Sequence, residues 1–269
     1  MKKLLLAFQF LTILPLKTIS GVSDRDIAAS SAFFVVVGLM QGLLMAATAF
    51  LFSSVFHPGL AIAMTLLILV LSNGGFHLDG LADTVDALSA KSSGNASRDR
   101  AKRLSMMKGG TTGPMGVIAI VFALALKYLA LQNISSLPYA TYYSSLILMP
   151  ILSKWTMVIS MYHAKPAREE GLGNIFIIGT GAKEAVISTM ILATLLALPE
   201  IFVGDLITIY QFPFYGVLLI TLYVLCRLWV NFFDVRFGGL TGDTVGAISE
   251  ISEVIFLLMV ILWSRLFIL

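Results

Sequence analysis

Long apolar runs separated by short polar stretches fill this chain from one end to the other. A helix that crosses a bilayer needs about 20 mainly apolar residues. Runs near or above that length cover residues 30–56, 60–78, 114–132, 139–163, 184–204, 213–233 and 251–269. The pattern predicts an all-α fold, a polytopic integral membrane bundle of about seven transmembrane helices that forms one domain over residues 1–269.

Two of the apolar segments have irregular ends. The run over 60–78 is interrupted near its end by Asn73-Gly74-Gly75. Within the first 16 residues, Lys2 and Lys3 are followed by a further apolar run, which contains Gln9 and Pro15. A signal peptide would begin in this way, but no small-residue cleavage site follows, so we favour a helix that lies in the membrane surface.

Composition supports a membrane protein and argues against other classes. Hydrophobic residues make up 58% of the chain and charged residues 12%, where globular domains carry roughly 25% charged residues. The mean hydropathy is +0.93. A single cysteine, Cys226, excludes a disulfide scaffold, and a net charge of +3 gives no reason to expect a nucleic-acid partner.

The basic residues predict the orientation in the membrane. They gather near the N-terminus and in the polar stretches 79–113, 164–183 and 234–250, whereas the opposite connections carry only Glu200 and Asp205 as charges. Because lysine and arginine are enriched in cytoplasmic loops, we expect the N-terminus and all three stretches inside. The functional site is therefore expected at the cytoplasmic face.

A short sequence echo suggests an internal repeat. Asp83-Thr-Val-Asp-Ala87 resembles Asp243-Thr-Val-Gly-Ala247, and a Gly-Leu pair precedes each. The apolar runs around the two copies match in order, with 139–163 between them, so we predict a possible parallel three-helix repeat. An echo of five residues also arises by chance.

The strongest chemical signal is an acidic stretch after the second run. His77-Leu-Asp79-Gly-Leu-Ala-Asp83-Thr-Val-Asp86 places three carboxylates within about 60° on one face of a helix. A hard divalent ion such as Mg²⁺ relieves their repulsion and is characteristically held by one or two carboxylates plus substrate phosphates. The alternative is a solvated acidic helix end, and we favour the metal site. His77 beside it is a candidate base or ligand.

A second acidic set follows a glycine-rich segment. Asp243, Glu250 and Glu253 come after Gly238-Gly-Leu-Thr-Gly242, with Arg236 just ahead. Backbone N–H groups of such a segment at a helix start suit a phosphate. Taken with the first set, this predicts two acidic helices that face each other across one cation.

A basic segment lies between the two acidic sets. Residues 98–108 carry five cations and end before Gly109-Gly-Thr-Thr-Gly113. It could clamp a polyphosphate leaving group, or it could only fix the topology or contact anionic lipid. We favour substrate contact for Arg103 and Lys108, which lie nearest the glycines.

Several segments together point to a known family. The chain contains Phe10-Leu-Thr-Ile-Leu-Pro15, Gly75-Phe-His-Leu-Asp-Gly-Leu-Ala-Asp-Thr-Val-Asp86, Met107-Lys108 before Gly113, Tyr162 to Pro166 with Gly171-Leu-Gly173, and Gly238-Gly-Leu-Thr-Gly-Asp-Thr-Val-Gly-Ala247 with Glu250. In kind and order, and over nearly the whole chain, these segments resemble cobalamin synthases, the adenosylcobinamide-GDP ribazoletransferases. The resemblance implies a Mg²⁺-dependent transferase at the cytoplasmic face of a prokaryotic inner membrane.

The resemblance also implies a reaction. A hydroxyl of α-ribazole, or of its 5′-phosphate, attacks the cobinamide-linked phosphorus of adenosylcobinamide-GDP, which forms adenosylcobalamin (phosphate) and expels GMP. The expected metal ligands are Asp79, Asp83, Asp86, Asp243 and, more weakly, Glu250, with His77 as the base. The expected phosphate contacts are Arg103, Lys108, Gly113, Arg236, Gly238, Gly239, Thr241 and Gly242.

One segment departs from the family pattern. Where the family usually has glutamate, aspartate and arginine, this chain has Ser105, Gly109 and Thr111. If those groups bind metal or phosphate in relatives, this protein does so with other residues. The departure bears on the site more than on the family.

Other functions remain alternatives. A CDP-alcohol phosphotransferase also uses aspartates on membrane helices, but its motif order is absent, as is the Asp-Asp-x-x-Asp of prenyltransferases. A cation transporter would place its carboxylates near the membrane midplane rather than at helix ends. The expected partners are the small-molecule substrates and the lipid bilayer, and a homo-oligomer stays open.

Overall fold

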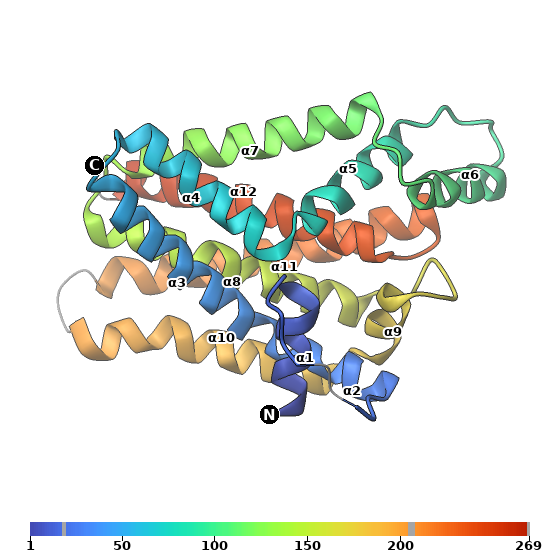
Figure 1. The fold of residues 1–269 in the computed structure, drawn as a ribbon, viewed down its shortest axis with the longest axis horizontal. Coiled ribbons are helices and arrows are strands. Elements are labelled where there is room, and N and C mark those ends of the chain that lie inside the picture. The colour runs from blue at the N-terminus through green and yellow to red at the C-terminus, as the bar shows by residue number, and fades with distance from the viewer. Residues whose placement is uncertain (18–19, 204–207, 268–269) are drawn as a thin grey trace.

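The computed structural model describes residues 1–17, 20–203 and 208–267, and side chains within these ranges outside 198–212. No β-strand occurs in this part of the chain. The helices are, in chain order, α1 (Lys2–Leu11), α2 (Asp24–Ala29), α3 (Phe34–Ser53), α4 (Pro58–Asn73), α5 (Phe76–Ser89), α6 (Ala96–Lys108), α7 (Pro114–Ile134), α8 (Tyr139–His163), α9 (Leu172–Gly179), α10 (Ala182–Val203), α11 (Thr208–Phe237) and α12 (Gly242–Phe267), with a 3₁₀ turn, η1 (Ser30–Phe33), before α3 (Figure 1).

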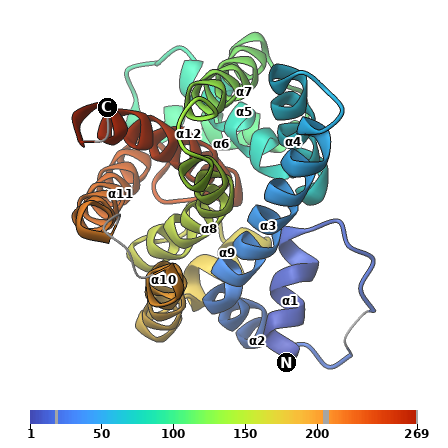
Figure 2. The ribbon, with the colours of Figure 1, turned by 90° about the vertical axis from the view of Figure 1, so that its left-hand side faces the viewer.

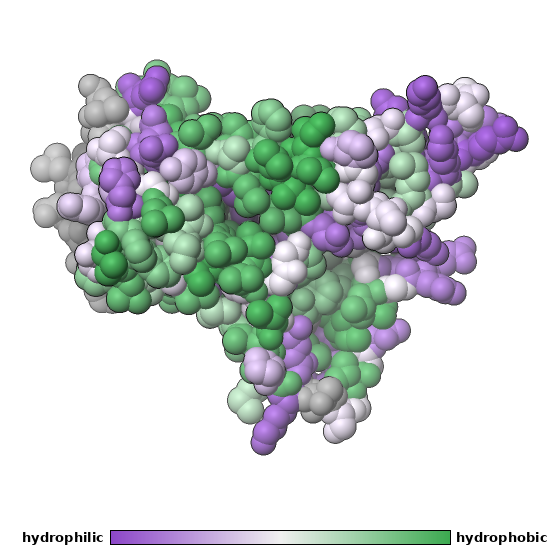
Figure 3. Space-filling view, turned by 45° about the horizontal axis from the view of Figure 1, so that its top comes forward, coloured by the Kyte–Doolittle hydropathy of each residue, from purple (hydrophilic) through white to green (hydrophobic). Residues whose placement is uncertain are grey.

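The helices confirm the predicted membrane bundle. In the described ranges, five helical stretches are long and apolar enough to cross a bilayer, and up to seven if each of two bent helix pairs is one span. Helix α8 has the predicted bounds, and α1, only 10 residues long, is too short to cross. Figure 3 shows a largely apolar flank on the bundle, with hydrophilic residues gathered at the end where α6 lies.

Helix α8 forms the centre of the bundle. It packs against α3, α10, α11 and α12 (Figure 2). Every residue from Leu146 to Met161 except Ile147 and Leu148 is buried. Cβ atoms placed on Gly38 and Gly42 of α3 would lie 2.5 and 2.3 Å from carbonyl oxygens of α8. Small residues four positions apart therefore let these two backbones touch, as is common between membrane helices.

The second predicted run is broken by a sharp bend. Gly74 and Gly75 have φ values of 68° and 75°, and α5 leaves α4 at an angle of 87°. Glycine adopts this left-handed conformation without steric penalty, so the pair turns the chain back toward the bundle. The predicted span over 60–78 ends at Asn73, and His77 belongs to the next helix.

The predicted polar stretch over 234–250 is almost entirely helical. Helix α11 continues to Phe237 and α12 begins at Gly242, so only residues 238–241 join them. The expected start of the last span at 251 was too late, because Glu250 and Glu253 are neutralised inside the bundle by Lys127. Acidic residues there do not end the helix.

The two copies of the sequence echo lie at different places in their helices. Asp83 is in the middle of α5, whereas Asp243 is in the first turn of α12. The parallel repeat stays a prediction.

Candidate functional site

Several of the predicted site residues lie at the end of the bundle where α5, α6 and α9 lie, on the right of Figure 1. Helix α12 packs lengthwise on α5 and contacts α9, while α6 packs on α5 and α11. Segments from three distant parts of the sequence thus surround the N-terminus of α12.

Two glycines bring α5 and α12 into direct contact. A Cβ atom on Gly80 would lie 2.8 Å from the carbonyl oxygen of Asp243, and one on Gly246 would lie 3.3 Å from the Cα atom of His77. The close approach places Asp243 beside the acidic face of α5. The structure thus brings α12 and Asp243 to α5, whereas a cation between the two helices stays a prediction.

Asp79, Asp83 and Asp243 form what we call the acidic site. Asp79 is exposed, whereas Asp83 and Asp243 are partly buried. The negative charges of Asp79 and Asp243 both act on Asp83. Three carboxylates that repel one another in a partly desolvated place need positive charge to be stable together.

Arg168 supplies part of that charge, and sequence reasoning left it out of the site. Its Nη1 atom lies 3.4 Å from Oδ2 of Asp243, and its charge also acts on Asp83. Nη2 donates to the carbonyl oxygen of Leu104 at 3.3 Å, while Nε is buried without a partner in the described part of the chain. Arg168 therefore reaches the acidic site through Nη1, and its Nε is a buried donor with no acceptor in the described ranges.

Backbone pairing holds the segment that carries Arg168. The N–H of Leu240 donates to the carbonyl of Lys165 at 2.9 Å, and the N–H of Ala167 donates to that of Leu240 at 2.8 Å. Gly239 has a φ of 152°, and a Cβ atom there would lie 2.4 Å from the Lys165 carbonyl oxygen. Glycine is required because the two segments leave no room for a side chain. Gly239 therefore serves packing here.

Asp86 engages a different partner. Its two carboxylate oxygens accept hydrogen bonds from the backbone N–H groups of Gly113 at 2.6 Å and Gly116 at 2.8 Å. These groups lie at the N-terminus of α7, where a negative charge is favourable. In this structure Asp86 ties α5 to α7, and Gly113 lies against it rather than on an open surface.

Glu250 lies inside the bundle. Its Oε2 atom is 2.6 Å from Nζ of Lys127, and both side chains are almost completely buried. It follows Asp243 by seven residues, about 10 Å along a helix axis. The structure therefore places Glu250 with Lys127 rather than with the acidic site.

His77 is also buried. The residue is 1% exposed, and neither ring nitrogen has a hydrogen-bond partner among the described residues. The residue faces α12, since a Cβ atom on Gly246 would lie 3.3 Å from its Cα atom. A role for His77 as a base stays a prediction.

The cations of α6 have mainly structural contacts. Arg103 donates to the carbonyl oxygen of Arg236 at 3.2 Å, and Arg100 donates to that of Val235 at 3.4 Å. They satisfy carbonyl groups at the C-terminus of α11, where positive charge is favourable. Lys108 and Arg236 are exposed, and the guanidinium of Arg236 lies 5.6 Å from the centroid of the Phe232 ring.

Hydroxyl groups fix the two ends of this region. Thr241 and Thr244 exchange backbone and side-chain hydrogen bonds at the start of α12, and Thr241 Oγ1 also donates to Asp243 at 3.4 Å. At the start of α6, hydrogen bonds from Ser92 and Ser93 lower the pKa of Asp99 to about 2. Asp99 therefore stays ionised and holds the loop before α6.

The acidic site fits a magnesium ion that shares its coordination with a substrate. No group of three or more His, Cys, Asp or Glu side chains in the described ranges is placed to hold a metal by itself. Mg²⁺ does not require this, because it usually binds through one or two carboxylates plus waters and substrate phosphates. The carboxylates of the acidic site keep some solvent exposure, which suits that mode, whereas the carboxylates of Asp86 and Glu250 are buried against protein partners.

The contact between α5 and α12 makes a testable prediction. Gly80→Ala would place a methyl group 2.8 Å from the Asp243 carbonyl oxygen, and we expect a loss of about 1–3 kcal/mol in unfolding free energy. The control is Gly216→Ala in α11, where nothing lies within 4 Å of the new Cβ atom. Equal melting temperatures for the two variants would contradict the contact.

The fold and site define a polytopic helical membrane protein with a partly exposed acidic site beside an arginine. The sequence model of the cobalamin-5-phosphate synthase family matches residues 3–261. The chain therefore belongs to this family and is a transferase of cobalamin biosynthesis.

Individual relatives are similar over nearly their full length. A protein of Thermodesulfovibrio yellowstonii named adenosylcobinamide-GDP ribazoletransferase is 30% identical over 98% of this chain and 97% of its own. Proteins of the same name from Geotalea daltonii and Clostridium botulinum (strain Okra) are 31% and 33% identical, over 95% and 96% of both chains. No solved structure matches this chain significantly.

Proposed function

We propose that this protein transfers the adenosylcobinamide phosphate group of adenosylcobinamide-GDP to α-ribazole or its 5′-phosphate and that the transfer requires Mg²⁺. A hydroxyl oxygen of the acceptor forms a bond to the cobinamide-linked phosphorus. The bond from that phosphorus to the bridging oxygen breaks, GMP leaves, and the hydroxyl proton passes to solvent or a base. The observation that carries this proposal is the close approach of Gly80 in acidic α5 to Asp243, with Arg168 3.4 Å from the Asp243 carboxylate.

Transfer to phosphorus depends mainly on positioning and on neutralised charge. When bound, Mg²⁺ supplies positive charge for the diphosphate and the leaving GMP. Asp79, Asp83 and Asp243 would hold the ion. Arg168 would contact phosphate oxygens from its place beside Asp243, while the exposed Lys108 and Arg236 would contact the outer phosphates.

The relatives and the basic residues also support a membrane and a face for the acidic site. Relatives are bacterial, which supports a prokaryotic cytoplasmic membrane, and the basic residues around the site support a cytoplasmic face. The proposed arrangement has the N-terminus and the acidic site on the same, inner side.

The direct test measures GMP release by purified protein in detergent. The reaction contains adenosylcobinamide-GDP and α-ribazole, each omitted in turn, with Mg²⁺ or with a chelator. Release that requires both substrates and Mg²⁺ supports the proposal. Release that is unaffected by the chelator would remove the metal from it, and no release from folded protein would redirect the search to CDP-alcohols.

Arg168→Gln tests the residue that the structure adds to the site. Loss of a charged donor to phosphate should lower kcat/KM for adenosylcobinamide-GDP by about 10- to 100-fold. Arg168→Lys should recover part of the activity because it keeps the charge but not the fork of donors. Lys165→Gln is the matched control, since Lys165 is in the same segment but forms an exposed ion pair with Asp234. Similar kcat/KM values for Arg168→Gln and the control would exclude the role.

A further inference from the structure

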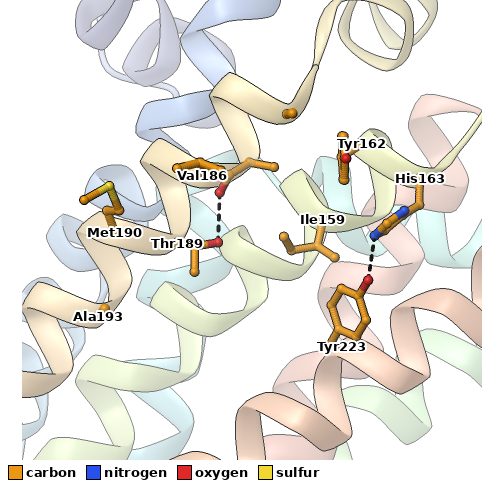
Figure 4. A pocket seen from close by; sticks show the side chains of 10 residues that line it. Ile159, Tyr162, His163, Val186, Thr189, Met190, Ala193 and Tyr223 are labelled. Carbon is orange, nitrogen blue, oxygen red and sulfur yellow. Dashed lines mark hydrogen bonds between the residues drawn. The ribbon is translucent and has the colours of Figure 1, made fainter.

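A cavity lies on the flank of the bundle, and its lining contains no residue of the acidic site. It has a volume of about 320 Å³ and lies between α8, α10 and α11; its lining includes Ile159, Ala185, Val186, Met190, Ala193 and Tyr223 (Figure 4). Helices α10 and α11 both pack against α8. We call this cavity the lateral groove.

The lateral groove opens on an apolar, lipid-facing surface. Val186 and Met190 of α10 are 55% and 66% exposed, and α10 belongs to one of the bent helix pairs apolar enough to span a membrane. An unfilled gap between packed helices loses dispersion contacts on its whole lining. In a bilayer, the molecule at hand to fill such a gap is the acyl chain of a lipid.

The end of the groove nearest the acidic site is polar. Tyr223 and His163 share a hydrogen bond of 3.1 Å, and Tyr162 lies beside them in Figure 4. Here α8 ends and α10 begins, so this end borders the same membrane face as the segment of Arg168. An amphipathic ligand with its polar part at this end fits the change in lining.

Arg227, near the polar end of the lateral groove, favours a lipid with an anionic headgroup. Arg227 is one helical turn beyond Tyr223 on α11, is exposed, and its charge acts on His163. No carboxylate in the described ranges forms an ion pair with it. An exposed arginine in a membrane-spanning helix requires an anionic or strongly polar partner. Lys183, next to the lining residue Ala182, adds positive charge at the same end.

We propose that the lateral groove binds one anionic phospholipid from the bilayer leaflet that borders the acidic site. One acyl chain lies along α10 between α8 and α11, and the headgroup phosphate pairs with Arg227 and Lys183. The site is independent of the transfer reaction, because its residues do not contact the acidic site.

Native mass spectrometry of the detergent-purified full chain tests the proposal with phosphatidylglycerol and phosphatidylcholine of the same acyl chains. The wild-type protein should bind one phosphatidylglycerol at least about 10-fold more tightly than phosphatidylcholine, as expected for a charged hydrogen bond. Arg227→Gln should remove this preference. Val186→Trp should weaken the binding of both lipids, because the indole fills the groove.

Matched variants separate the groove from the general membrane surface. Arg265→Gln removes another exposed arginine of a spanning helix, and Val217→Trp adds an indole at an exposed position of α11 outside the lining. Both should bind lipid as the wild type does. Equal affinity of the wild type for the two lipids, no retained lipid, or equal effects of test and control variants would each overturn the proposal.

Discussion

Asp83→Asn is expected to lower the rate of GMP release by about 10²- to 10³-fold at saturating substrate, the size of effect that follows loss of one preorganised charge contact at a transition state. The negative charges of Asp79 and Asp243 both act on the carboxylate of Asp83. The asparagine side chain keeps the size of aspartate but cannot offer a carboxylate to a cation. The variant should therefore stay folded while requiring a higher Mg²⁺ concentration.

The measurement is the initial rate as a function of Mg²⁺ concentration, with melting temperature as the check on folding. Glu170→Gln is the matched control, because Glu170 is an exposed acid near Arg168 that forms no ion pair in the described chain. It should leave the Mg²⁺ dependence unchanged. A folded Asp83→Asn protein with the wild-type rate would remove Asp83 from the site, and with it the proposed ion position.

The fold could be predicted from the sequence where it depends on local properties. Apolar length and polarity are local, so the span over 139–163 and the interruption at Asn73-Gly74-Gly75 could both be recognised. The direction of the 87° bend could not, because it depends on how α5 packs on α12. The sequence predicts too late a start for the last helix, because nothing local in it shows that Glu250 and Glu253 are paired with Lys127.

The site shows the same limit. The spacing of Asp79 and Asp83 predicts one helical face, and the set Asp243, Glu250 and Glu253 predicts a second acidic helix. Arg168 could not be assigned, because its position depends on backbone pairing of its segment with Leu240, far along the chain. Lys127 is 123 residues from Glu250, so nothing local in the sequence indicated that this carboxylate was already paired.

Lys127→Met is expected to cause the largest loss of stability, because it leaves carboxylates unpaired in the bundle interior. Lys127 contacts both Glu250 and Glu253, and all three side chains are at most 5% exposed. Removing one partner of a buried ion pair typically costs 3–5 kcal/mol, and we expect a loss of about that size here. Unfolding in mixed micelles of increasing SDS content, followed by tryptophan fluorescence, would measure it.

Lys154→Met provides the matched control in the same network. Lys154 is equally buried, but its nearest carboxylate oxygen, on Glu253, is 3.9 Å away and its closer contacts are the hydroxyl groups of Ser153 and Ser249. Its loss should therefore destabilise the protein less than the loss of Lys127. Adding Glu250→Gln and Glu253→Gln to Lys127→Met should restore much of the stability, because neutral amides do not need a cation. If the added substitutions destabilise the protein further, packing of the lysine stem rather than charge pairing holds α7 to α12.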